Sequence, residues 1–598
     1  MANCAWRRAF AAHQQGAQVA VLIGLALSMA LLALIAPTVV RAAEFSQTPI
    51  MLVETWLHRG PIRRAALLPD GERWVTVSDD RSARVWRLRD GVLKRVLRPP
   101  LGLDGDGKLY AVAAQPKTGL IAVAGYTGKE WRPEVSVYLF NWQNSALVKR
   151  LSGLPDVVNH LAFSANGRYL AAGLASGGVR VFDVASGRLA GGDAEYGKPV
   201  TWLDFAPDGR MVSASADGRL RLYDADLRKA GEKMLGHAGA TPFSARFSPD
   251  GGYLAVGRTE GAPLALNSRD LSISFQPSSA RFDGGMPLVA WSEDGRYLFA
   301  GGGRRDSNRA AMARKWDLKR NGQWVDLHLG AGLVSDLTPL PGGGLAYVTE
   351  SGSMGALDAY GIAYFRHDSP SRDYHAPGAT LRLSADGAVA RFGRSSAAGA
   401  GDMSAFSMRD LHPMSDAELA GRVLRDPLTQ TRLVEVSGWQ NGDKPKVNRR
   451  IPLTLNGSER GRAVALSADS RFVALATDVH LYLFRSNGAQ IWRTALPAEA
   501  QAVNISGNSR WVAVALSDGT IRWYDLALGR ERAALYPHAN GKSWVAWNPL
   551  MYWSASDDAN GMLGWSVNVS EERAPRYLPA IKQNRGYRNA EAVSKVFR

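Results

Sequence analysis

Short apolar stretches that alternate with polar residues fill most of the chain and predict β-strands. In VTWLDFAPDGRMVSASADGRLRLYD (200–224), three such stretches are separated by two Asp-Gly pairs. Strict alternation puts one face of each strand into a core, and Asp-Gly is a preferred pair in tight turns. We therefore predict three consecutive antiparallel strands, joined by short turns, in this segment.

The same pattern recurs at a nearly constant interval. Similar stretches occupy 160–184, 244–257 and 288–302. The residues at the first turns of the four stretches lie 42, 42 and 44 residues apart: Asn166, Asp208, Asp250 and Asp294. A period of roughly 40–45 residues is typical of the four-stranded blades of a β-propeller. Extending the interval in both directions predicts about twelve blades between residues 50 and 570.

Twelve blades exceed the number that one ring usually holds, so we predict an all-β fold with two tandem propellers. The expected domains are 43–330 and 331–570, followed by a basic tail over 571–598. Six plus six and seven plus five blades both fit the spacing. Residues 51–57 (MLVETWL) look like a lone outer strand that completes the last blade of a ring and removes an open sheet edge.

An uncharged apolar segment near the N-terminus predicts export or membrane anchoring. As a helix, residues 19–36 would span about 27 Å, close to the hydrocarbon thickness of a bilayer. Arg7 and Arg8 precede the segment, so the positive-inside rule sends the rest of the chain across the membrane. Residues 1–42 are then either a signal peptide cleaved after Ala42 or an uncleaved anchor. Arg7-Arg8-Ala9-Phe10 also resembles a twin-arginine export signal. Export by the twin-arginine route and export by the general route are therefore both open.

The formal net charge of +17 favours anionic partners. From Arg573 onward, the chain has seven Lys and Arg residues and a single acidic residue, Glu591. We name Arg585, Arg588 and Lys595 as candidate docking residues for an anionic protein or membrane surface. The alternatives are a solvated tail, or a tail partly packed on the last blade. The single cysteine, Cys4, excludes an intrachain disulfide.

Several dipeptides in the repeats resemble the WD40 family. Trp316-Asp317 matches its diagnostic pair, and Phe182-Asp183, Tyr223-Asp224 and Tyr524-Asp525 are looser versions. Gly236-His237 matches the Gly-His of that family, while His58 and His538 lie at comparable places without the glycine. The resemblance implies that such His, Ser and Asp residues brace each blade through buried hydrogen bonds. The repeat positions it marks are Asp183, Asp224, His237, Trp316, Asp317 and Asp525.

The C-terminal region resembles bacterial WD40 proteins that are often fused to a caspase-like peptidase. The residues that carry this resemblance are Trp547-Asn548-Pro549 and Gly564-Trp565-Ser566-Val567-Asn568. The 598 residues contain no peptidase domain, so we expect no peptidase activity.

The motifs of common enzymes are missing from the sequence. There is no His-Glu-x-x-His, no Gly-x-Ser-x-Gly and no cysteine cluster. We therefore expect no catalytic residues, no metal and no cofactor. Residues 487–493 (NGAQIWR) resemble the tryptophan-docking repeat of quinoprotein-like propellers, so a periplasmic enzyme of that type is the alternative.

The prediction for function is a non-catalytic scaffold that binds protein partners. A propeller is rigid and presents loops on two faces, which suits binding without catalysis. We expect a bacterial protein that is periplasmic, or anchored in the inner membrane and facing the periplasm. Nucleic acid is not an expected partner, because the basic residues form no recognisable nucleic-acid-binding motif.

Overall fold

Antiparallel strands account for nearly all regular structure in the computed structural model of the protein. The structure describes residues 45–102, 105–129, 131–236, 240–278, 284–305, 310–374, 380–393, 403–457, 459–582 and 585–598. Within them lies one short α-helix, α2 (Ala590–Ser594). The predicted all-β class is thereby confirmed, whereas the apolar segment 19–36 lies outside the described residues.

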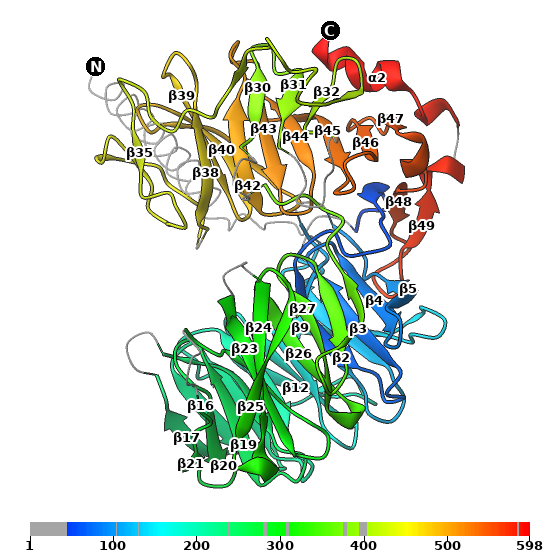
Figure 1. The fold of residues 1–598 in the computed structure, drawn as a ribbon, viewed down its shortest axis with the longest axis vertical. Helices are drawn as coiled ribbons and strands as arrows, with labels where there is room; N and C mark the ends of the chain where they lie inside the picture. Colours follow the sequence, from blue (N-terminus) through cyan, green and yellow to red (C-terminus); the bar gives the residue numbers. More distant parts are fainter. Residues whose placement is uncertain are drawn as a thin grey trace, which may run out of the picture. The chain divides into compact units, whose positions relative to one another are not determined.

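Seven four-stranded sheets follow one another between residues 62 and 367 (Figure 1). The first four comprise β2 (Ile62–Leu67), β3 (Arg73–Ser78), β4 (Ser82–Arg87), β5 (Val92–Leu97); β6 (Lys108–Ala114), β7 (Ile121–Tyr126), β8 (Val135–Phe140), β9 (Leu147–Leu154); β10 (Val158–Phe163), β11 (Tyr169–Leu174), β12 (Val179–Asp183), β13 (Leu189–Asp193); and β14 (Val200–Phe205), β15 (Met211–Ser215), β16 (Arg219–Tyr223), β17 (Lys229–Met234). The next three comprise β18 (Pro242–Phe247), β19 (Tyr253–Arg258), β20 (Leu264–Asn267), β21 (Ile273–Phe275); β22 (Leu288–Trp291), β23 (Tyr297–Arg305), β24 (Ala310–Asp317), β25 (Gln323–Ala331); and β26 (Val334–Leu340), β27 (Gly344–Thr349), β28 (Met354–Leu357), β29 (Ala363–His367).

The first strand of each of these sheets packs against the first strand of the next. The series β2, β6, β10, β14, β18, β22 and β26 returns on itself, because β26 also contacts β2. The boundary predicted near residue 330 falls at the end of β25, just before β26. The contact of β26 with β2 places the sheet of β26 in the same ring as the six before it, so seven blades share this ring.

The later sheets are less regular. A five-stranded sheet contains β30 (Arg382–Ser384), β31 (Val389–Arg391), β32 (Ala405–Ser407), β33 (His412–Met414) and β34 (Leu424–Arg425). Three short strands follow as β35 (Val436–Ser437), β36 (Lys446–Val447) and β37 (Ile451–Pro452). The next sheet has the regular blade form, with β38 (Gly461–Leu466), β39 (Phe472–Thr477), β40 (His480–Arg485) and β41 (Gln490–Ala495). A six-stranded sheet then joins β42 (Ala500–Ile505), β43 (Trp511–Leu516), β44 (Ile521–Asp525), β45 (Glu531–Pro537), β46 (Trp544–Trp547) and β47 (Trp553–Ala555).

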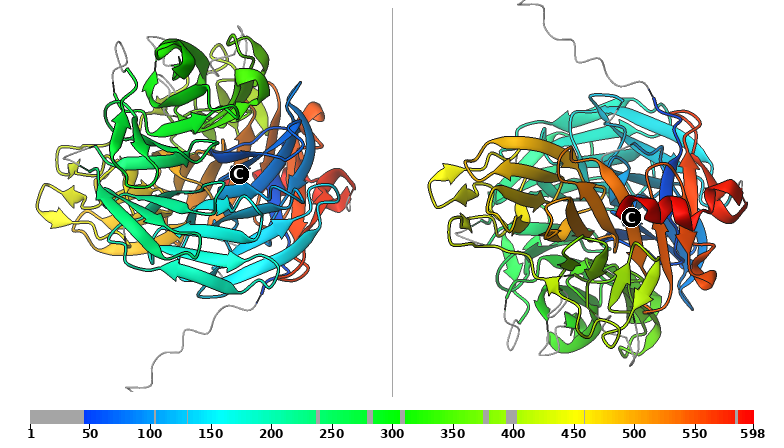
Figure 2. Two further views of the ribbon diagram at one scale, coloured as in Figure 1. Left: turned by 90° about the horizontal axis from the view of Figure 1, so that it is seen from below. Right: turned by 90° about the horizontal axis from the view of Figure 1, so that it is seen from above.

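The first and last parts of the described chain meet in one sheet. β1 (Ile50–Val53) pairs antiparallel with β48 (Leu563–Val567), which also pairs with β49 (Arg576–Pro579). Figure 2 (right) shows β1, in dark blue, beside these orange-red strands. The lone outer strand predicted at 51–57 therefore forms over residues 50–53, and its partner is the last sheet of the chain.

A repeated turn explains the regular spacing seen in the sequence. In Ser248-Pro249-Asp250-Gly251, the Ser248 hydroxyl donates to Asp250 Oδ1 at 2.5 Å, and Asp250 accepts the Gly252 N–H at 2.9 Å. An Asp or Asn side chain that binds backbone two residues ahead is a standard way to fix a tight turn. The same Ser-to-Asp or Ser-to-Asn bond recurs at Asn166, Asp294, Asp386, Asp469 and Asn508.

The end of the basic tail packs on the sheets. The carboxyl-terminal residues form α2 and a 3₁₀ turn over Lys595–Phe597, and Phe597 is buried against Trp511 and Trp523 at centroid distances of 5.1 and 5.8 Å. The Asn589 side chain caps α2 by accepting the Ala592 N–H at 3.0 Å. This part of the tail is thus a component of the fold, as the partly packed alternative predicted.

Phe597→Ala should lower the free energy of unfolding by about 3 kcal/mol, because it leaves a cavity between two buried tryptophans. Urea unfolding followed by tryptophan fluorescence measures the change. The exposed neighbour Lys595 gives the control, and Lys595→Ala should leave the midpoint almost unmoved. Equal midpoints for Phe597→Ala and the unmodified protein would show that the tail does not pack as described.

Candidate binding site

A buried hydrogen-bond network braces the first blade. His58 Nδ1 lies 2.9 Å from Asp80 Oδ2, and His58 Nε2 lies 2.7 Å from Thr76 Oγ1. Trp86 Nε1 donates to the same Thr76 hydroxyl oxygen at 2.8 Å. Asp80 also accepts the hydroxyl and the N–H of Ser82. The bracing role that the resemblance implied for blade histidines is therefore visible at His58.

The other repeat positions hold turns separately and do not form one site. Asp183 and Asp525 end the third strand of their sheets and Asp224 follows one, and all three accept N–H groups of the next turn. Asp317 caps a 3₁₀ turn over Leu318–Arg320 and pairs with Arg296 at 2.7 Å. Trp316 is fully buried and donates to the Ser278 carbonyl. His237 lies outside the described residues.

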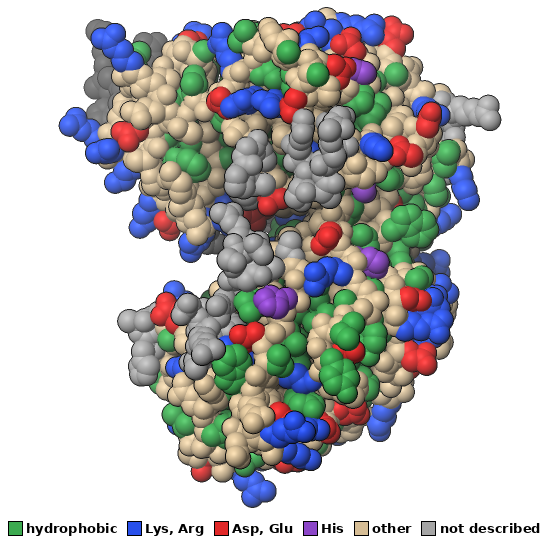
Figure 3. Space-filling view, viewed as in Figure 1, with side chains coloured by type: hydrophobic (Ala, Val, Ile, Leu, Met, Phe, Trp, Pro, Cys, Tyr) green, Lys and Arg blue, Asp and Glu red, His purple; other side chains and the backbone are tan. Residues whose placement is uncertain are grey.

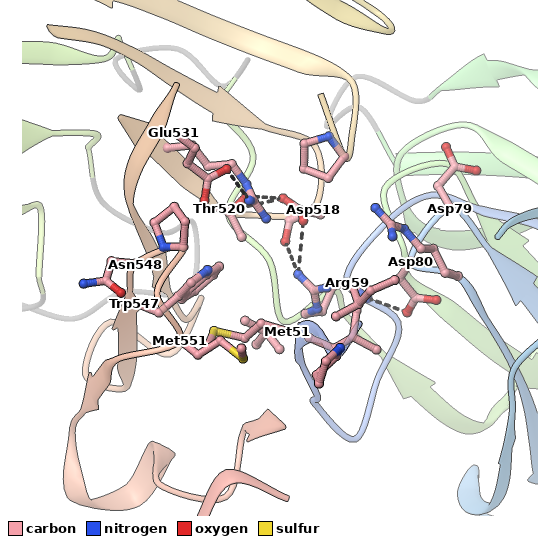
Figure 4. Close-up of a pocket in the computed structure, with 18 residues that line it drawn as sticks. Met51, Arg59, Asp79, Asp80, Asp518, Thr520, Glu531, Trp547, Asn548 and Met551 are labelled. Carbon is pink, nitrogen blue, oxygen red and sulfur yellow. Dashed lines mark hydrogen bonds and ion pairs between the residues drawn. The ribbon is translucent and has the colours of Figure 1, made fainter. Parts of the chain in front are cut away.

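A cavity of about 350 Å³ lies beside this braced blade (Figure 4). It is lined by β1, by the β3–β4 turn of the first blade and by the β43–β44 turn of the later six-stranded sheet. Figure 4 shows Met51, Met551 and Trp547 on one side, with Arg59 and Asp518 facing each other on another. The wall is therefore apolar on one side and charged on the other, as in many sites for small ligands.

Most of the charges around the cavity are paired. Arg59 Nη1 donates to the Asp518 carbonyl and carboxylate at 3.1 and 3.3 Å. Arg522 pairs with Glu531 at 2.7 Å. Burial opposes ionisation of Asp518, but Arg59 and Arg522 outweigh it and lower the pKa of that carboxyl. These pairs join the two turns by charge-assisted bonds, which are stronger than neutral ones.

Arg81 is the exception in the charged wall. It is 8% exposed, and its Nη1 donates to the Gly102 carbonyl at 3.1 Å. Burial, reinforced by the charge of Arg522, lowers the pKa of the Arg81 guanidinium to about 10. Sequence reasoning missed this residue, although a signal was present: an arginine stands where other repeats have glycine.

The side chains described above suit binding. His58, Asp80 and Ser82 are the residue types of a hydrolase triad, yet all three are buried and occupied with one another. A nucleophile must reach its substrate, so this network is not a catalytic one. In the described part of the chain, no group of three or more His, Cys, Asp or Glu is placed to hold a metal ion.

The candidate docking residues of the tail do not gather at this cavity's lining. Arg588 is exposed, lies 3.8 Å from Asp557 and stacks over Trp553. Lys595 is exposed next to α2. Arg585 belongs to a short 3₁₀ turn over Arg585–Tyr587. A docking role for the three stays a prediction.

Thr76→Val should lower the free energy of unfolding by about 3 kcal/mol, because it leaves the Trp86 N–H and a ring nitrogen of His58 buried without their shared partner. Thermal or urea unfolding measures the loss. Thr201→Val is the matched control, since the Thr201 hydroxyl is half-buried and bonds only a backbone carbonyl. A similar loss in both variants would contradict a special role for the network.

Comparison with known proteins identifies the repeats. The model of the "WD domain, G-beta repeat" family matches residues 52–87, 146–183 and 194–224. The model described as "Anaphase-promoting complex subunit 4 WD40 domain" matches residues 464–554. The first set of matches falls mainly on four-stranded sheets of the seven-bladed ring, and the second covers the sheet of β38–β41 and the six-stranded sheet of β42–β47. No helix within the described residues has the length and apolar character needed to cross a bilayer.

Known proteins with similar sequences include the following three. Telomerase protein component 1 of Rattus norvegicus is 26% identical over 40% of this chain and 9% of its own length. Target of rapamycin complex subunit wat1 of Schizosaccharomyces pombe is 22% identical over 31% of this chain and 56% of its own. WD repeat-containing protein 1 of Xenopus tropicalis is 25% identical over 46% and 36%. The matches thus span only part of each relative. Together with the blades and the His58 network, they show that this chain contains WD40 repeats.

Proposed function

We propose that the protein is a non-catalytic scaffold that binds protein partners outside the cytoplasm. The observation that carries the proposal is an exposed apolar patch on the sixth and seventh blades. Its members are Val325, Tyr360, Ile362 and Tyr364, which we call the β25–β29 patch. Tyr360, Ile362 and Tyr364 are 88%, 67% and 55% exposed. Grouped apolar side chains of this kind mark surfaces that bind other proteins.

The patch is held in place by the blades beneath it. The turn between β28 and β29 approaches β25 so closely that a Cβ at Gly361 would lie 3.2 Å from Leu327. Lys315 Nζ donates to the Ala359 carbonyl at 3.0 Å and ties the turn to β24. Asp358 accepts the N–H groups of Tyr360 and Ile362. Figure 3 shows hydrophobic side chains grouped among charged ones in the lower part of the face it draws.

The rigid turn favours binding, because little conformational entropy is lost when a partner covers it. Tyrosine also combines a large apolar ring with a polar hydroxyl, which is why it is enriched in interfaces. The alternative of a quinoprotein-like enzyme has less support. Trp492 of the docking-like stretch donates its Nε1 to the Leu526 carbonyl and packs on Gly529, which is ordinary contact between neighbouring sheets.

Replacing Tyr360, Ile362 and Tyr364 together by serine should abolish partner binding while leaving the melting temperature unchanged. Immobilised protein, crosslinked to envelope extract and analysed by quantitative mass spectrometry, would show specific partners falling at least tenfold. The matched control replaces Val148, Leu189 and Ile273, which are similarly exposed on other outer strands. Partners that survive the first triple variant, or that are lost equally in the control, would refute this use of the patch.

The location outside the cytoplasm is supported by Arg7, Arg8 and the apolar residues 19–36. Alkaline phosphatase fused after residue 598 should be active, because that enzyme requires export. Replacing Arg7 and Arg8 by lysine should stop export if the twin-arginine route is used and leave it intact if the general route is used. An inactive phosphatase fusion, with an active cytoplasmic reporter at the same site, would exclude export.

A further inference from the structure

Arg81 occupies a position that other blades give to glycine. It is the third residue of the β3–β4 turn, and its N–H donates to the carbonyl of Ser78 at 3.2 Å. The same bond is made by Gly218 to Ser215, by Gly519 to Leu516 and by Gly352 to Thr349. These turns are therefore the same turn in different blades.

The backbone at this position is left-handed in every case. The φ angle is 66° at Arg81, against 89°, 79° and 85° at Gly218, Gly519 and Gly352. Glycine adopts such angles without cost, whereas a residue with a Cβ is strained there. Strain of this kind is concentrated at functional positions, where the side chain has a use that outweighs its cost.

The side chain of Arg81 lines the cavity without a counter-ion. Among the described residues, no carboxylate lies within 4.0 Å of its guanidinium, which donates to the Gly102 carbonyl. The carboxylates that line the same cavity have other partners: Asp79 with Arg63, Asp80 with His58, Asp518 with Arg59 and Glu531 with Arg522. Asp106 is also buried nearby and accepts the Gly128 N–H. Arg81 is thus a lining residue whose guanidinium has no directly paired carboxylate among the described residues.

The opposite wall supplies apolar contact. Met51 and Leu52 come from β1, Trp547 ends β46, and Pro549 and Met551 come from the β46–β47 connection. Methionine side chains adapt their shape and pack well against varied apolar groups. A cavity lined by this guanidinium and by apolar side chains fits a molecule that has one negative end and one apolar end.

We propose that this cavity binds a small monocarboxylate with an apolar chain, with the carboxylate on Arg81 and the chain against Met51, Trp547 and Met551. The guanidinium fork matches the two oxygens of a carboxylate. A dianion such as phosphate fits less well, because Asp518, Glu531 and Asp80 surround the same space and would repel the second charge. This site is separate from the β25–β29 patch, so it adds a small ligand to the proposed scaffold function.

Octanoate is a suitable probe, and 1-octanol is its uncharged control. Isothermal titration of the full chain with octanoate at pH 7 should give saturable binding with one site, and the melting temperature should rise with octanoate concentration. Binding of 1-octanol and of inorganic phosphate should each be at least tenfold weaker. No octanoate binding, or equally strong binding of 1-octanol or phosphate, would overturn the proposal.

Arg81→Gly tests the residue itself. It restores the residue that the repeat uses, so the turn should form without strain, and octanoate affinity should fall at least tenfold. Arg81→Gln should give the same loss of affinity, and this variant removes the charge without introducing a glycine. Arg89→Ala removes an exposed arginine of the same blade and should leave affinity unchanged. Unchanged affinity in both Arg81 variants, measured on protein with a normal melting temperature, would show that Arg81 only supports the turn.

Discussion

The contact between β26 and β2 is the one on which the arrangement of the seven blades depends. A four-stranded sheet has two faces, and in these blades buried residues occupy both, so each sheet needs a neighbour on either side. Only a closed series gives every sheet two neighbours. At the closing contact, the Asp336 carboxylate accepts the Ala65 N–H at 3.0 Å, and the Ser335 hydroxyl donates to the Ile62 carbonyl. These bonds add to the apolar packing that holds β26 against β2.

Closure also brings charged residues of several first strands together. Arg64 of β2 and Arg246 of β18 both stack on Trp202 of β14, at 4.9 and 4.8 Å from the ring centre. Asp336 of β26 lies 3.5 Å from Arg246. Burial lowers the pKa of Arg64, and Asp336 opposes that shift. Contact with one tryptophan ring and the negative charge of Asp336 therefore stabilise two arginines that come from different blades. This arrangement cannot be seen in the sequence of a single blade.

Much of the fold could be predicted because each turn is specified by a few consecutive residues. Ser248-Pro249-Asp250-Gly251 contains every group that its turn needs, so its spacing in the sequence is the spacing of the blades. The ring boundary was harder, since it depends on β26 contacting β2, more than 260 residues away, and nothing near residue 330 records that contact. The His58 network could be predicted only in part. Its residue types were visible, but Thr76 and Trp86 become recognisable as partners only once β3 and β4 are paired.

The cavity was out of reach for a further reason: its walls come from both ends of the described chain. β1 supplies Met51 and pairs with β48, while Asp518 and Trp547 come from the later sheets. A wall built this way exists only when β1 is in place. Anything that binds in the cavity must therefore favour the state in which β1 is paired, by the same mass action through which ligands stabilise native proteins. Residues 1–42 end a short distance before β1 in the sequence. Cleavage after Ala42 would spare the strand, so the first strand of the fold can serve the cavity whether or not the segment before it is removed.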